Sequence, residues 1–249
     1  MGIKREDREY SEEQYPIIIV SLEDCMLELY SFSSNLKNPN AIENLCQGVI
    51  RRGFLNAHCL RRIYQISPPT RNNPLTYEEG KDINVFLLTF LFNVSGIIDN
   101  LSWVWFYEKN IYEKEDPDKY KFNVHLFNKD FKKYLTDKVK KEIKKFDKWL
   151  IHIKTFRDPI AHRIQPYVIP YFLDEERLKE YNLLVNKFNT ETDIEERDSL
   201  LKEMDNCGVY EPAYMHSANE GSPIVAMHAQ LLTDTNRIIE LIKIIRGNL

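Results

Sequence analysis

One short segment combines residue types that can handle a phosphate group: Arg157-Asp158-Pro159-Ile160-Ala161-His162. The unperturbed pKa of histidine lets it both accept and donate a proton near neutral pH. A guanidinium group binds phosphoryl oxygens in a bidentate geometry. Asp158 and Pro159 form a pair typical of a helix start, so we expect the chain to kink or restart a helix between Arg157 and His162.

A second segment shows how easily the loose pattern of an Arg followed by a His arises. Arg52 and His58 have a similar spacing, in a chain with 13 Arg and 6 His. This pair falls in the middle of an expected helix and lacks a polar residue after the Arg. The polar Asp158, the small Ala161 and the late position favour the first segment over the second.

The segment RDPIAH resembles the motif of the HEPN superfamily (higher eukaryotes and prokaryotes nucleotide-binding domains). In that motif an Arg, often followed by Asn, Asp or His, precedes a His near a late helix of a helical bundle. Arg157, Asp158, Ala161 and His162 match it, whereas Pro159 departs from many active relatives. The similarity covers about residues 15–165 and the C-terminal helix, and looks like a branch of largely uncharacterised bacterial HEPN proteins.

The resemblance implies metal-independent cleavage of RNA in a toxin or phage-defence setting, with an antitoxin or other partner protein. His162 is then the general base that deprotonates a ribose 2′-OH, and Arg157 stabilises the charge on the phosphoryl oxygens. Asp158 then either orients the neighbouring site residues or caps a helix end, and it takes no part in the chemistry. One His per chain does not easily serve as base and acid together, so the resemblance also implies a homodimer that pairs two motifs.

The alternative is a non-catalytic HEPN module that binds nucleotides or a partner protein, with Arg157 and His162 as a structural pair. The sequence lacks CxxC pairs, HExxH, GxSxG and a P-loop, which disfavours zinc enzymes, serine hydrolases and NTPases. We therefore expect no metal and no cofactor. The choice between the enzyme and the binding module stays open at this point.

Composition indicates an all-α protein of the cytoplasm. The 249 residues are 43% hydrophobic and include only 8 Gly, which disfavours a chain of many tight turns. The four cysteines are scattered and the charged N-terminus lacks an apolar signal segment, as expected for a reduced intracellular protein. The uncharged run 83–98 is shorter than a membrane span needs, so we expect no membrane association.

Apolar periodicity predicts an up-and-down bundle of four to five long helices, taken as a single HEPN-like domain over residues 1–249 with an inserted acidic helical hairpin. An extended segment is expected at 166–172, because Pro166 and Pro170 break a helix, and an irregular segment at 210–221. The expected helices are 16–36, 40–65, 77–107, 129–156, the hairpin 174–205, and a last helix from Ser222.

Two further sets of polar residues are candidates for supporting roles. Asp99 and Asn100 interrupt the apolar third helix, either as satisfied buried groups or as part of a functional cleft. Residues 129–148 contain nine Lys against four acids, and Lys140, Lys144 and Lys148 are candidate RNA contacts. A lysine face of this kind is usually just solvated, which is the competing interpretation.

Overall fold

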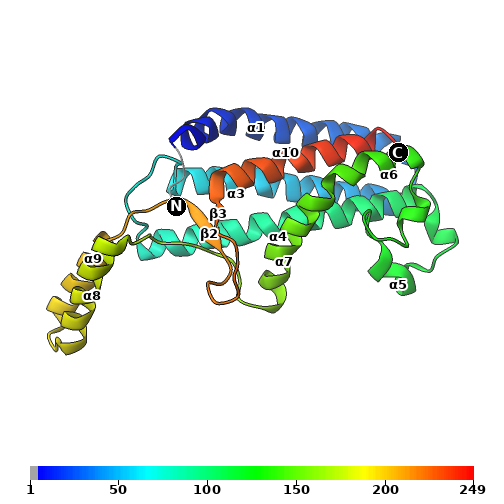
Figure 1. Cartoon of the computed structure of the whole chain (residues 1–249). Helices are drawn as coiled ribbons and strands as arrows, with labels where there is room; N and C mark the ends of the chain where they lie inside the picture. Colours follow the sequence, from blue (N-terminus) through cyan, green and yellow to red (C-terminus); the bar gives the residue numbers. More distant parts are fainter. Residues whose placement is uncertain (1–4) are drawn as a thin grey trace.

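Four long helices pack lengthwise into an all-α bundle, as Figure 1 shows: α1 (Arg5–Phe32), α3 (Arg51–Ile66), α4 (Tyr77–Glu108) and α10 (Met227–Arg246). The chain is described here by a computed structural model of residues 5–249, apart from the side chains of Arg5, Ala161 and His162. The helices α1 and α10 lie side by side and form one layer of the bundle. The predicted helical bundle is confirmed.

The remaining elements connect these four helices or lie at the periphery of the bundle. They are the helices α2 (Pro39–Glu43), α5 (Pro117–Tyr120), α6 (Asp137–Ile143), α7 (Asp147–His162), α8 (Glu175–Thr190) and α9 (Ile194–Asn206), and the strands β1 (Tyr167–Val168), β2 (Ala213–Met215) and β3 (Val225–Ala226). Short 3-10 turns lie at Ser33–Asn35, Ile111–Glu113, Lys121–Asn123, Lys132–Tyr134 and Lys144–Phe146, and a π-helical turn, η2, at Asn44–Ile50.

The third expected helix, α4, forms the centre of the bundle. Thr76 accepts from the Glu79 amide, while the Glu79 carboxylate accepts from the Thr76 amide, so a complete capping box starts the helix. Its apolar side chains are buried against α3, α7 and α10. Among the described residues α4 is the one helix long and apolar enough to cross a membrane, and half of its most apolar window is buried inside the bundle.

Two prolines that suggest helix starts lie inside helices instead. The first helix begins at Arg5 and runs through Pro16, and α7 runs through Pro159 to His162. The predicted break at Asp158–Pro159 is therefore wrong. A proline removes one backbone hydrogen bond, here the one that would reach the Thr155 carbonyl. The last turn still closes, because the amide of Arg163 donates to the Pro159 carbonyl at 3.0 Å.

The predicted helices 40–65 and 129–156 are interrupted. The first begins at Pro39, capped by Asn38 rather than Asn40, and passes through the π turn η2 before α3. The second is split into a 3-10 turn, α6, a further 3-10 turn and α7. Thr136 starts α6 as its N-cap, accepting from the Val139 amide at 3.3 Å. The lysines of 129–148 therefore do not lie along one straight helix.

A small antiparallel sheet, in the order β1-β2-β3, lies between α7 and α10 in the chain. Strand β2 falls within 210–221, where an irregular segment is predicted, and β3 precedes α10, which starts at Met227 rather than Ser222. The expected acidic hairpin is present as α8 and α9, and it projects from the bundle at the lower left of Figure 1. It has a small apolar cluster of its own around Leu184, Leu200 and Met204.

Candidate functional site

An open cleft of about 310 Å³ lies where α7 crosses α4. Helix α4 contributes Ser95 and Asp99, and α7 contributes Lys154, Arg157 and Asp158. The third wall is the connection between α5 and α6, which supplies Phe122, His125, Phe127 and Asn128. Two predicted site residues, Arg157 and Asp158, thus share one cleft with the predicted supporting residue Asp99.

Arg157 is available at the surface of this cleft. Its side chain is 36% exposed, and its Nη1 donates to the Asp158 carboxylate at 3.2 Å. Lys154 lies three residues earlier, one turn back on the same face of α7. The cleft thus places two cations, Arg157 and Lys154, beside the carboxylates of Asp99 and Asp158.

His125, which the sequence analysis does not single out, faces Asp99 across the cleft. The distance from His125 Nε2 to Asp99 Oδ1 is 3.7 Å. The amide of Phe127 donates to His125 Nδ1 at 3.3 Å, so in the neutral imidazole the proton is on Nε2, on the side of Asp99. His125 is thereby oriented as a donor toward that carboxylate.

The backbone around His125 is anchored by the core. Val124 and Leu126 are buried on either side of it. The Leu126 amide donates to Ser102 Oγ at 2.9 Å, and Ser102 Oγ in turn donates to the backbone carbonyl of Ile98 at 2.8 Å. A His flanked by two apolar residues in an otherwise polar loop is the sequence pattern that could have revealed this residue.

Burial and neighbouring charges shift the pKa values of the two facing groups. Burial raises the pKa of Asp99 above its ordinary value, and the charges of Arg157, Arg52 and Lys154 act in the opposite direction. Burial, with a smaller effect of Lys154 and Arg157, lowers the pKa of His125 to about 4. His125 is therefore neutral at pH 7 and is a poor proton acceptor there.

A second, larger cavity of about 780 Å³ adjoins the other side of Arg157. Lys154, Arg157 and Asp158 line it as well, together with Arg163 and His216. His216 is buried, its Nδ1 has no hydrogen-bond partner among the described residues, and the Glu220 carboxylate is 3.8 Å away. Arg157 thus lines two hollows, each with a histidine in its wall.

The predicted base, His162, is the last residue of α7. Its side chain lies outside the described part of the structure, so its position relative to Arg157 stays a prediction.

The expected RNA contacts Lys140, Lys144 and Lys148 lie on α6, on the 3-10 turn that follows it and at the start of α7. By helical spacing Lys148 shares a face with Ile151 and Thr155, which line the second cavity. Lys140 pairs with Asp137 at 3.0 Å.

Asn100 does not join Asp99 in the cleft. Its Oδ1 accepts from Arg52 Nε at 3.3 Å, and its Nδ2 donates to Asn44 Oδ1 at 3.1 Å. Arg52 Nη1 also donates to Asn93 Oδ1 at 2.8 Å. We call Arg52 with these three Asn residues the Arg52 network. The network accounts for Asn93 and Asn100 of the polar strip as internal groups, although Asn93 Nδ2 has no hydrogen-bond partner among the described residues. Asp99 is the charged residue of the strip that lines the cleft.

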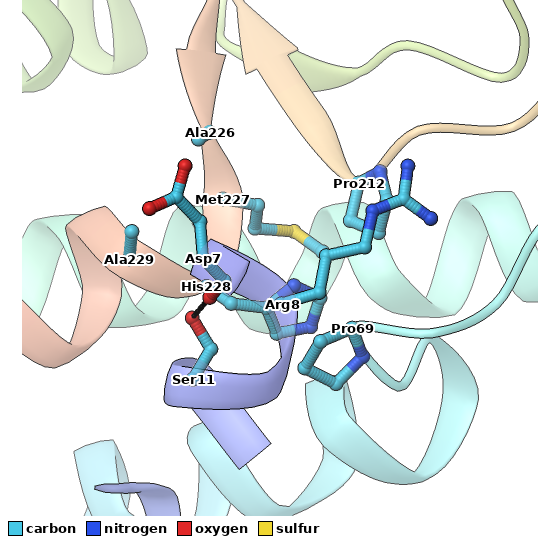
Figure 2. A pocket seen from close by; sticks show the side chains of 9 residues that line it. All are labelled: Asp7, Arg8, Ser11, Pro69, Pro212, Ala226, Met227, His228 and Ala229. Carbon is cyan, nitrogen blue, oxygen red and sulfur yellow. Dashed lines mark hydrogen bonds between the residues drawn. The ribbon is translucent and has the colours of Figure 1, made fainter. Parts of the chain in front are cut away.

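Another histidine, His228, is buried in the core. Its Nε2 donates to the Ser67 carbonyl at 2.7 Å, and burial lowers its pKa to about 4. The cavity beside it, between α1 and α10, is only about 20 Å³ (Figure 2), enough for one water molecule. In the described part of the chain no three His, Cys, Asp or Glu side chains are grouped closely enough to hold a metal ion.

Comparison of the chain with protein-family models, with curated proteins and with solved structures finds no match. The resemblance to HEPN proteins thus rests on the segment RDPIAH and on the helical bundle around it.

Proposed function

We propose that the cleft beside Arg157 binds RNA and that the protein is a metal-independent endoribonuclease of the HEPN type. The observation that carries this proposal is the position of Arg157, exposed between two hollows and accompanied by Lys154. A cationic pair in an open cleft attracts a phosphodiester, and the guanidinium group can bind two of its oxygens.

In the proposed reaction His162 takes the proton of a ribose 2′-OH, and the 2′ oxygen attacks the adjacent phosphorus atom. The bond from phosphorus to the 5′ oxygen breaks, and that oxygen leaves with a proton as a 5′-hydroxyl. The other product ends in a 2′,3′-cyclic phosphate. Arg157 stabilises the negative charge that builds on the phosphoryl oxygens, and Asp158 holds Arg157 in place before RNA binds.

Asp99 and His125 are positioning residues in this account. The charge of Asp99 limits how closely a phosphate approaches that side of the cleft, and so favours a pose in which the phosphate lies against Arg157 and Lys154. His125 Nε2 lies 3.7 Å from Asp99 Oδ1 and the imidazole stays neutral at pH 7, so it does not compete with His162 for the role of base.

A homodimer that brings two Arg157 clefts together would supply the second histidine that the reaction needs as an acid. Apolar side chains flank the motif at the surface: Ile151 is 68% exposed and Ile164 is 54% exposed. Exposed apolar side chains on both sides of a polar site are typical of an interface. Sedimentation is expected to show a dimer at tens of micromolar. A monomer at that concentration would contradict the shared site.

The second candidate function is binding of a nucleotide without cleavage. It is favoured by the hydrogen bond from Arg157 to Asp158, which orients the guanidinium group at rest, and by a cleft volume of about 310 Å³, suited to one small ligand. Under this alternative Arg157→Ala weakens nucleotide binding, and no RNA is cut.

The test is cleavage of single-stranded RNA by the purified protein in EDTA. We expect products with 2′,3′-cyclic phosphate and 5′-hydroxyl ends, and no cleavage of DNA of the same sequence, which lacks the attacking 2′-OH. His162→Ala is expected to abolish cleavage, and the matched control His58→Ala, at an exposed position on α3, to retain it. Cleavage that persists in His162→Ala would refute the assignment of the base.

A further inference from the structure

A third cavity, of about 470 Å³, lies at the opposite end of α4 from the Arg157 cleft. Its walls come from the first two turns of α4, from β1 with the chain that follows it, and from the end of α9. The side chains with chemistry to offer are Tyr77, Lys81, Tyr167, Tyr171 and Asp205. We call it the tyrosine cavity. Its volume is in the range of small-molecule sites, about 300–1,000 Å³.

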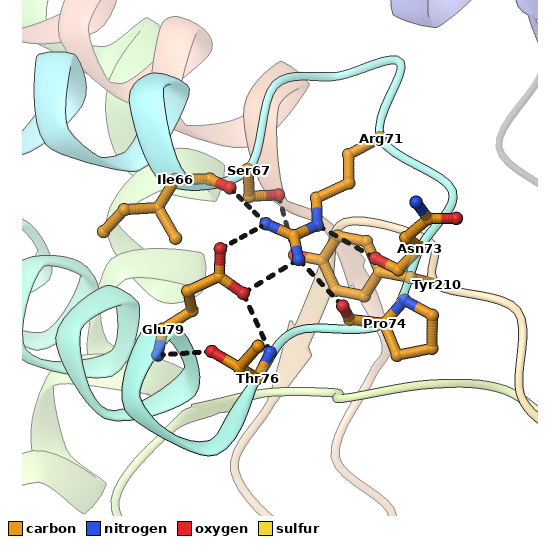
Figure 3. A network of polar contacts seen from close by, with 8 residues as sticks. All are labelled: Ile66, Ser67, Arg71, Asn73, Pro74, Thr76, Glu79 and Tyr210. Atoms are coloured by element: carbon orange, nitrogen blue, oxygen red, sulfur yellow. Dashed lines mark hydrogen bonds and ion pairs between the residues drawn. The ribbon is translucent and has the colours of Figure 1, made fainter. Parts of the chain in front are cut away.

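The rim of the tyrosine cavity is held in place by the network of Figure 3. Arg71 donates to both carboxylate oxygens of Glu79 and to the backbone carbonyls of Ile66, Asn73 and Pro74. Glu79 belongs to the capping box of α4, so the network fixes the loop before the helix to its first turn. The first turn, which includes Tyr77, is therefore preorganised.

The opposite wall is equally fixed. Asn84 Oδ1 accepts from the Val168 amide at 2.7 Å, which joins β1 to α4 and places Tyr167 at the cavity. Tyr171 OH donates to Tyr181 OH at 3.4 Å. Gly80 forms part of the floor, and a Cβ atom there would meet nothing within 4 Å. The cavity is thus an open space between rigid walls.

The chemistry of these walls suits a flat, nitrogen-rich ring. Tyrosine faces bind such rings by stacking. Lys81 Nζ lies over the Tyr77 ring, 4.4 Å from its centre, which places a cation beside this stacking surface. Asp205 is acceptor-only when ionised, so it pairs with amino groups and repels phosphate. These features together select a nucleobase that has an exocyclic amino group, with its phosphate directed outward.

The exposed face of α4 connects the tyrosine cavity to the Arg157 cleft. Residues at helical spacing along this face are Tyr77, Lys81, Leu88, Phe92, Ser95 and Asp99. Tyr77 and Asp99 are about 33 Å apart along the axis, at 1.5 Å per residue. Phe92, 44% exposed between them with Arg52 over its ring at 5.9 Å, offers a further stacking surface. A stacked strand spans this distance with about ten nucleotides or fewer.

We propose that the tyrosine cavity binds an unpaired adenine, cytosine or guanine of single-stranded RNA, whose neighbouring nucleotides follow α4 to the Arg157 cleft. The proposal rests on RNA as the ligand of that cleft. The base site defines the substrate of the proposed ribonuclease more narrowly. That substrate is single-stranded RNA that carries a base with an exocyclic amino group several nucleotides from the bond that is cut. Uracil, which has no exocyclic amino group, binds less well beside Asp205.

The experiment measures binding separately from cleavage, by fluorescence anisotropy of labelled ten-nucleotide oligoadenylate and oligouridylate in EDTA with the Arg157→Ala protein. We expect oligoadenylate to bind more tightly than oligouridylate. Tyr77→Ala and Tyr167→Ala are each expected to weaken oligoadenylate binding by about tenfold, since one base loses a stacking partner. Asp205→Ala should narrow the difference between the two oligonucleotides. Tyr30→Ala, at a 67% exposed tyrosine on α1, is the control and should change nothing.

The outcomes separate this proposal from the proposed ribonuclease activity. Loss of oligoadenylate binding in Tyr77→Ala and Tyr167→Ala supports the base site even if the wild-type protein cuts no RNA. Unchanged binding in both folded variants, or tighter binding of oligouridylate than of oligoadenylate, overturns the base site even if cleavage is observed. Melting curves of each variant identify any loss of binding that comes from unfolding.

Discussion

The chain contains two Arg–His segments of similar spacing, and the structure puts their arginines in opposite situations. Arg52 is enclosed by α3, α4 and η2, donates to Asn93 and Asn100, and lies against Gly96. Arg157 lines two open hollows, and its hydrogen-bond partner among the described residues is the adjacent Asp158. The Arg52 guanidinium links α3 to α4 through two hydrogen bonds, and the Arg157 guanidinium is available to a ligand.

The difference shows that the residue types of a motif matter less than the partners that the fold supplies. The amide oxygens of Asn93 and Asn100, which accept hydrogen bonds from Arg52, do not titrate. The groups around Arg157 are charged or ionisable, namely Asp99, His125 and Lys154. We therefore expect the stability of the protein to depend on the Arg52 network. Ligand binding and catalysis should depend on the Arg157 cleft.

The largest expected difference is in the free energy of unfolding. Arg52→Ala should lower it by about 3 kcal/mol, because the variant leaves buried amides of the network without a charged donor. Arg157→Ala should change it by no more than about 0.5 kcal/mol, as for other exposed positions. Urea unfolding measures both, with Arg51→Ala, at an exposed arginine of α3, as the control. Equal losses for Arg52 and Arg157 would remove the distinction between the two sites.

The Arg157 cleft should also make stability depend on pH through His125. Its folded-state pKa of about 4 lies below the ordinary value of 6.5, so its contribution to stability is present above pH 6.5 and is lost as the pH falls through 4. Between pH 7 and pH 4 the wild type should lose about 2 kcal/mol more than His125→Gln. Urea unfolding at a series of pH values tests this. The exposed-site variant His58→Gln should retain the wild-type pH dependence, and a pH dependence unchanged in His125→Gln would contradict the assignment.

A smaller effect is expected from adding one methyl group beside Arg52. The Cβ of Gly96→Ala would lie 2.6 Å from Arg52 Cζ and would displace that side chain, at a cost of about 1.5 kcal/mol. Gly80→Ala, in the same helix but in open space, should be neutral or slightly stabilising. In the Arg52→Ala background the cost of Gly96→Ala should largely vanish. Additive losses in the double variant would show that the two residues do not interact.

The smallest predicted effect concerns the lysines of α6 and the start of α7. Replacing Lys140, Lys144 and Lys148 by Gln should weaken RNA binding by about fivefold and lower the salt slope by about 2, if each contacts one phosphate. A matched triple change in the acidic hairpin, at Lys179, Lys187 and Lys202, alters the net charge equally and should leave the slope unchanged. If the two triple variants behave alike, the first three lysines are simply solvated.

The sequence predicts those elements that have a long apolar pattern or a capping residue within their own segment. Helix α4 has an apolar run and a capping box, and the hairpin α8–α9 has two clear N-caps, Asp174 and Asp193. Prolines are less informative, because Pro16 and Pro159 each remove only one hydrogen bond from helices that packing maintains. The β2 strand was not predictable from its own residues, since it forms only by pairing with β1 and β3.

The candidate site was predictable only in part. Arg157 and Asp158 follow from one contiguous segment, but Asp99 and Asn100 are adjacent and yet point to different networks, which depends on the rotation of α4 within the bundle. His125 joins the cleft through a loop fixed by the bond between Leu126 and Ser102, residues far apart in sequence. Contacts of this kind follow from the packed fold and have no local signal.

The most direct test of the account is cleavage of one single-stranded RNA in EDTA by the wild type, Arg157→Ala and Arg52→Ala, each measured at a temperature where all three are folded. The account predicts that Arg157→Ala reduces the rate by about 100-fold or more, as expected on losing a group that stabilises transition-state charge. Arg52→Ala, although less stable, should retain a rate within about threefold of the wild type. Wild-type cleavage that survives in Arg157→Ala but is lost in folded Arg52→Ala would contradict the central claim that Arg157 marks the functional cleft.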